Sequence, residues 1–72
     1  MTKGELRAQE YRARARDAWA LVETATLEHV REQRRRSAYT WTAMAEAEEA
    51  RVVEGMRLQA ATLVRQCLAR GA

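Results

Sequence analysis

The chain has 72 residues and a formal net charge of +3, with no proline, one cysteine and one histidine. This length allows one small domain over 1–72, and a domain of this size is marginally stable alone. A single cysteine excludes an intrachain disulfide, and Cys67 and His29 do not have the spacing of metal ligands. We therefore expect no metal and no cofactor, and oligomerisation remains as the means of stabilising the fold.

The composition predicts an all-α protein. Alanine, arginine and glutamate dominate, and the three glycines lie at Gly4, Gly55 and Gly71. One straight helix of this length would extend about 108 Å and could bury nothing against itself. The chain must therefore fold back on itself, associate with a partner, or do both.

The first helix is expected over about 3–24. Small and apolar residues recur there at alternating steps of three and four, which is the pattern of an amphipathic helix. This stripe contains Ala8, Tyr11, Ala15, Ala18, Val22 and Ala25.

A turn is expected at about 25–26, with Thr26 as the N-cap of a second helix over about 27–70. Glu28 would then lie in the first turn, where the helix dipole favours a negative charge. A rival break lies at 34–37, with Ser37 as the N-cap. The earlier break is preferred because it keeps Glu32 near two arginines on a continuous helix.

The second helix is too long for the first one to cover. Its stripe runs through Val30, Ala38, Trp41, Ala45, Val52, Met56, Ala60, Leu63 and Cys67, and Glu48 interrupts it. The first helix can cover only residues 27 to about 49. Either a second copy covers the remainder, or the chain breaks near Gly55 and folds back as a compact three-helix bundle.

The preferred fold is an antiparallel helical hairpin with a longer second helix, which self-associates into a four-helix bundle as a homodimer. Aromatic anchors and the apolar stripe of the second helix are expected to form the interface between copies. These residues are Trp19, Trp41, Val52, Met56, Ala60, Leu63, Val64 and Cys67.

The segment 11–49 resembles a group of short, uncharacterised alphaproteobacterial helical-hairpin proteins. The resemblance is carried by Tyr11, Ala25-Thr26, Val30-Arg31, Trp41 and Met44-Ala45. It implies a tyrosine-led first helix, a turn that contains threonine, and an aromatic residue in the second helix. It implies no activity, because none is established for the group.

Two groups of arginines would form a basic girdle once the chain folds back. They are Arg12, Arg14 and Arg16 of the first helix and Arg34, Arg35 and Arg36 of the second. With a turn near Thr26, residues whose numbers add to about 52 face each other. The girdle could bind phosphates, so the alternative function is that of a small nucleic-acid-associated protein. It could also face the acidic segment 46–54 of another copy.

No enzymatic reaction is expected, because the carboxylates fall on helix faces that the pattern indicates are solvated. The cluster of Glu46, Glu48 and Glu49 is interpreted as such a face. His29 is expected to be exposed near the turn, and Cys67 to be a small buried hydrophobe. The start of the chain lacks the apolar region of a signal peptide, and no apolar run is long enough to span a membrane. The sequence thus favours a cytoplasmic interaction module that binds itself and that could also dock the helix of another protein.

Overall fold

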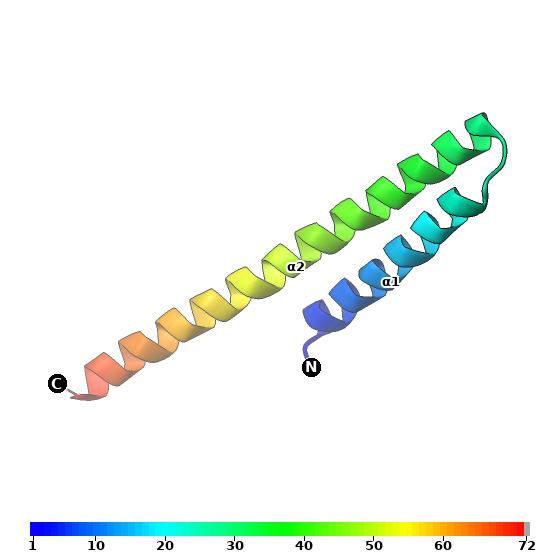
Figure 1. Cartoon of the computed structure of the whole chain (residues 1–72). Helices are drawn as coiled ribbons and strands as arrows, with labels where there is room; N and C mark the ends of the chain where they lie inside the picture. The colour runs from blue at the N-terminus through cyan, green and yellow to red at the C-terminus, as the bar shows by residue number, and fades with distance from the viewer. Residues whose placement is uncertain (72) are drawn as a thin grey trace.

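The computed structural model describes residues 1–71 and consists of two helices, α1 (Lys3–Thr24) and α2 (Glu28–Gly71). The helices are antiparallel and side by side, and α2 continues far beyond the N-terminal end of α1 (Figure 1). The described chain measures 68 × 17 × 13 Å along its principal axes. The prediction of an all-α antiparallel hairpin with a longer second helix is confirmed.

Helix α1 begins and ends through local hydrogen bonds. At its start the Thr2 hydroxyl accepts a bond of 3.1 Å from the backbone N–H of Glu5, as an N-cap does. The Glu5 carboxylate lies in the first turn, near the positive end of the helix dipole. At the other end Ala25 has an extended backbone with ψ of 128°, so the helix stops there without a glycine.

The expected N-cap at Thr26 is wrong. Helix α2 begins at Glu28, and the carbonyl of Leu27 accepts the 2.9 Å bond from the Arg31 N–H. Within residues 1–71 the Thr26 hydroxyl forms no side-chain hydrogen bond. Two arginines of α2 hold the turn instead, by donating to carbonyl oxygens at the end of α1. Arg31 reaches the carbonyl of Ala25 and Arg34 that of Leu21, each at 2.9 Å.

Alanines at heptad spacing form the seam between the helices. Ala8 and Ala15 of α1 are buried, and Ala38 and Ala45 of α2 are completely inaccessible to solvent. Small side chains at every seventh position allow two helices to approach closely along their whole contact. The core is therefore narrow, and no large side chain of the described chain is fully buried.

Aromatic pairs flank this seam on both helices. Tyr11 lies against Trp41 with ring centroids 6.0 Å apart, in agreement with the expectation that facing residue numbers add to about 52. Trp19 meets Tyr39 edge to face at 4.9 Å, and its indole N–H donates to the Thr42 hydroxyl at 3.1 Å. These pairs fill the edges of a contact whose centre holds mainly alanine side chains.

The register differs in part from the prediction that facing residue numbers add to about 52. The sum is 52 for Tyr11 and Trp41, but it is 61 for Trp19 and Thr42. Helix α1 therefore reaches further along α2 than expected. A β-carbon added to Gly4 would lie 3.2 Å from a methyl group of Val52.

Both alternative breaks in the second helix are wrong. Helix α2 is continuous through Ser37 and through Gly55. Gly55 has an ordinary helical backbone, with no positive φ, and no atom lies within 4 Å of the position of an added β-carbon. The chain therefore forms no third helix within residues 1–71, and the end of α2 stays without cover.

Candidate interaction surface

The C-terminal half of α2 has no cover from the rest of the chain. Every residue from Val53 to Gly71 is exposed, although several are large and apolar. Met56 is 54% exposed, Leu63 is 55% exposed and Leu68 is 70% exposed. An apolar surface this continuous is typical of a protein interface.

The apolar residues of this segment share one face, which we call the tail face. Successive residues of a helix are about 100° apart, so steps of three and four return to the same side. The tail face comprises Val53, Met56, Ala60, Leu63, Val64 and Cys67. On the same geometry it is turned by only about 60° from the side of α2 that contacts α1. Leu58, which is 53% exposed, lies on the opposite side of the helix.

Charged residues lie at the edges of the tail face or on the opposite side of the helix. The Glu54 carboxylate accepts two hydrogen bonds from Arg57, at 2.6 and 3.0 Å. These bonds hold the pKa of Glu54 below its usual value. Arg65 and Arg70 add two further positive charges, so this end of the helix is basic.

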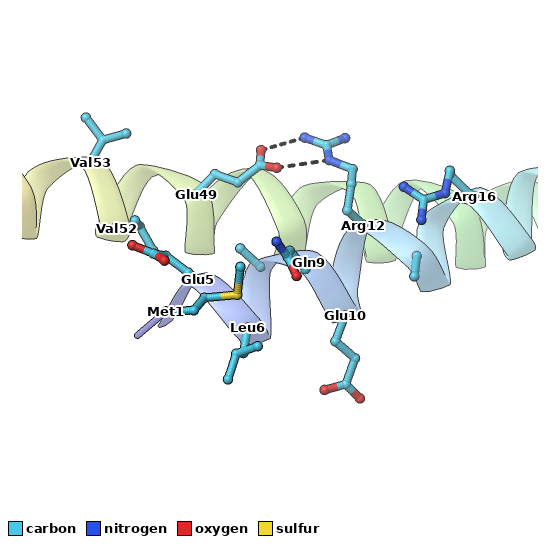
Figure 2. Close-up of a pocket in the computed structure, with 12 residues that line it drawn as sticks. Met1, Glu5, Leu6, Gln9, Glu10, Arg12, Arg16, Glu49, Val52 and Val53 are labelled. Atoms are coloured by element: carbon cyan, nitrogen blue, oxygen red, sulfur yellow. Dashed lines mark hydrogen bonds and ion pairs between the residues drawn. The ribbon is translucent and has the colours of Figure 1, made fainter. Parts of the chain in front are cut away.

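An open groove of about 830 Å³ joins the tail face to α1. Its apolar walls include Met1, which precedes α1, Leu6 of α1, and Val52 and Val53 of α2 (Figure 2). Met1 is 76% exposed and Leu6 is 53% exposed, so both could be covered further. Val53 belongs both to the groove and to the tail face, which makes the two surfaces continuous.

The groove also contains a bidentate ion pair. The guanidinium of Arg12 donates to the Glu49 carboxylate at 2.6 and 3.1 Å (Figure 2). The hydrogen bonds from Arg12 lower the pKa of Glu49, and those to Glu49 raise the pKa of Arg12. Both side chains remain partly exposed, so solvent weakens the attraction between them.

Glu48 corrects the interpretation of the acidic cluster as a solvated face. Its side chain is buried in the helix seam, where the stripe of α2 is interrupted. Its two carboxylate oxygens face Arg51 at 2.6 Å and Arg7 at 3.5 Å. A buried carboxylate with fixed partners favours one register of the two helices.

The predicted arginine girdle is largely engaged in contacts within the chain. Arg14 pairs with Glu10 and lies 5.0 Å over the ring of Trp41. Arg35 and Arg36 both reach Glu32, at 2.7 and 3.8 Å. The other contacts of the girdle are those of Arg12 with Glu49 and of Arg34 with the end of α1. Among the six, only Arg16 forms no ion pair or hydrogen bond with any described residue.

The other residues expected at an interface fall into two groups. Trp19 and Trp41 are half-buried against α1 and α2, so their principal contacts lie within the hairpin. Cys67 is exposed, against the expectation of a buried thiol, and it lies on the tail face, where another chain could cover it. His29 is exposed, as expected.

Two sets of contacts in the structure were not predicted from the sequence. Arg31 and Arg34 were not identified as the residues that hold the turn, because long side chains reach partners that helical spacing does not specify. The pairing of Arg7 with Glu48 was missed for the same reason. The polar gap at Glu48 in an apolar stripe was the available clue, since a charge in such a place needs a partner.

The chain matches no family model, no curated protein and no solved structure. Among the residues described, no group of three or more histidine, cysteine, aspartate or glutamate side chains could hold a metal ion. Neither α1 nor α2 is long and apolar enough to cross a membrane.

Proposed function

We propose that this chain is a helical interaction module that works by homodimerisation through its tail face. The hairpin of α1 with the first part of α2 is the folded head of each copy. The observation that supports the proposal is the exposure of every residue from Val53 to Gly71 on a continuous helix.

Helix stability gives the physical reason for a partner. An isolated helix of fewer than about 12–15 residues is marginal in water, and longer ones still depend mainly on packing. The tail exposes a row of apolar side chains that α1 leaves uncovered. Burial of such side chains stabilises by about 25 cal/mol per Å² of apolar surface. A homodimer supplies this burial without any other molecule.

The test is the mass of the particle in solution, measured by light scattering during gel filtration at micromolar concentration. We expect the mass of two chains for the natural sequence. The substitution Leu63→Glu should produce monomers, because it would bury two unpaired charges per dimer. If Leu63→Glu weakens the affinity between the two copies about hundredfold, the loss in binding free energy is about 2.7 kcal/mol.

Leu58→Glu is the matched control for this experiment. Leu58 is as exposed as Leu63 but lies on the opposite side of α2. This variant should remain dimeric. A monomeric natural chain, or equal dissociation by both substitutions, would contradict the proposal.

A further inference from the structure

The partner and orientation at the tail face can be specified further. We propose that the tail face packs on the same face of a second copy, in antiparallel orientation, with a two-fold axis near Ala60. This inference rests on the proposed homodimerisation, since it describes the geometry of that interface.

The order of apolar residues along the tail is the first argument. Read outward from Ala60, Met56 and Val64 lie four positions to either side, and Val53 and Cys67 lie seven positions to either side. A two-fold axis at Ala60 therefore places Met56 of one copy level with Val64 of the other, and Val53 level with Cys67. The alanine at the centre allows close approach, as the alanines do between α1 and α2.

Charge along α2 is the second argument, and it selects the antiparallel orientation. The segment 46–54 contains four glutamates and one arginine, whereas the segment 57–70 contains three arginines and no acidic residue. Antiparallel pairing about Ala60 places the basic end of each helix alongside the acidic segment of the other. Parallel pairing would instead place Glu49 beside Glu49 and Arg70 beside Arg70, and like charges at such positions are unfavourable.

The groove provides the third argument, because it receives the end of the partner. An axis at Ala60 brings the last turns of the partner helix level with Val52, where the groove opens between α1 and α2. Cys67 of the partner's tail face lies in those turns, level with Val53 at the edge of the groove. The folded heads lie at opposite ends of the dimer, so they do not compete for the tail face.

Crosslinking through cysteine tests the geometry, and the chain supplies its own reporter. In the antiparallel dimer the two Cys67 residues are 14 positions apart, about 21 Å along the axis, and a short bismaleimide reagent cannot join them. Two residues at position 60 face each other. We therefore expect Ala60→Cys in a Cys67→Ser background to crosslink at least tenfold faster than the natural chain.

Val53→Cys is the variant that reports orientation directly. Position 53 of one copy lies level with Cys67 of the other, so this variant should also give a crosslinked dimer. The same reaction in denaturant controls for random collision, and light scattering confirms that each variant is still a dimer.

Each other outcome overturns the inference. Rapid crosslinking of the natural chain through Cys67 would mean parallel pairing. A dimer in which neither Ala60→Cys nor Val53→Cys crosslinks would mean that another surface joins the copies. A monomer by light scattering is a different result, because it removes the proposed function itself.

Discussion

The alanines of the seam determine how closely α1 and α2 approach. Ala38 and Ala45 have no exposed surface, and no large side chain among residues 1–71 is fully buried beside them. The contact between α1 and α2 is stable because the side chains at its centre are small as well as apolar. A larger side chain at such a position therefore destabilises the hairpin, as does the removal of a packed one.

Ala45→Leu should therefore destabilise the hairpin by about 1–3 kcal/mol, because the added atoms force the helices apart. Ala47→Leu is the control, since Ala47 is exposed on the same helix. Chemical denaturation followed by circular dichroism measures both variants. Equal stability of the two would mean that the seam is not closely packed.

The ion pair between Arg12 and Glu49 gives the hairpin a dependence on pH. Because Arg12 lowers the pKa of Glu49 in the folded state, the stabilisation is complete above the ordinary value of 4.5. It is lost as the pH falls below 4.5 and through the lower folded pKa. Glu49→Gln should lower the melting temperature at pH 7, and the difference from the natural chain should disappear in acid. A difference that persists unchanged at low pH would contradict this role of the carboxylate.

At the scale of the element, α2 is the unusual feature of the chain. It has 44 residues, twice as many as the 22 of α1, and it contains a glycine in its interior without a kink or a positive φ. The glycine weakens the helix where α1 stops covering it, but it does not break it.

Gly55→Ala tests whether the helix is continuous. Alanine is favoured over glycine in a helix interior by about 1 kcal/mol, and the added β-carbon would meet no other atom within 4 Å. We expect higher stability by about this amount and an unchanged dimer. Gly4→Ala is the comparison, because its β-carbon would crowd Val52 at 3.2 Å and offset part of the gain. A loss of stability in Gly55→Ala would indicate a bend at Gly55.

Periodicity predicted the elements well and their ends less well. The stripe from Ala8 to Val22 and the pairing of Tyr11 with Trp41 follow from helical spacing, which a sequence displays directly. The start of α2 was predicted one residue too early, and Thr26 was predicted to cap it. In the structure, a backbone hydrogen bond to Leu27 and the side chains of Arg31 and Arg34 stabilise this turn instead. Such contacts depend on how far a flexible side chain extends, and the spacing of residues along the sequence does not indicate which partner it reaches.

At the scale of the whole molecule, the chain divides into a folded head and an uncovered tail. The head engages most of the arginines that were predicted to form a basic girdle, through contacts with Glu10, Glu32, Glu49 and the end of α1. Nucleic-acid binding stays a prediction, and retention on nucleic acid that falls steeply with rising salt would support it. The tail was expected from the sequence to need cover. Its apolar face could be defined only once Gly55 was known to lie within a continuous helix.

Hydrogen exchange of the backbone amides from Met56 to Leu68, measured over a range of protein concentrations, tests the central claim most directly. A tail that is stabilised by a second copy should become more protected as concentration rises, and protection should level off when the dimer is complete. The amides of the head, such as those around Ala15 and Ala45, should be protected at every concentration. Protection of the tail that does not depend on concentration, or its absence at concentrations well above those of dimer formation, would contradict the account.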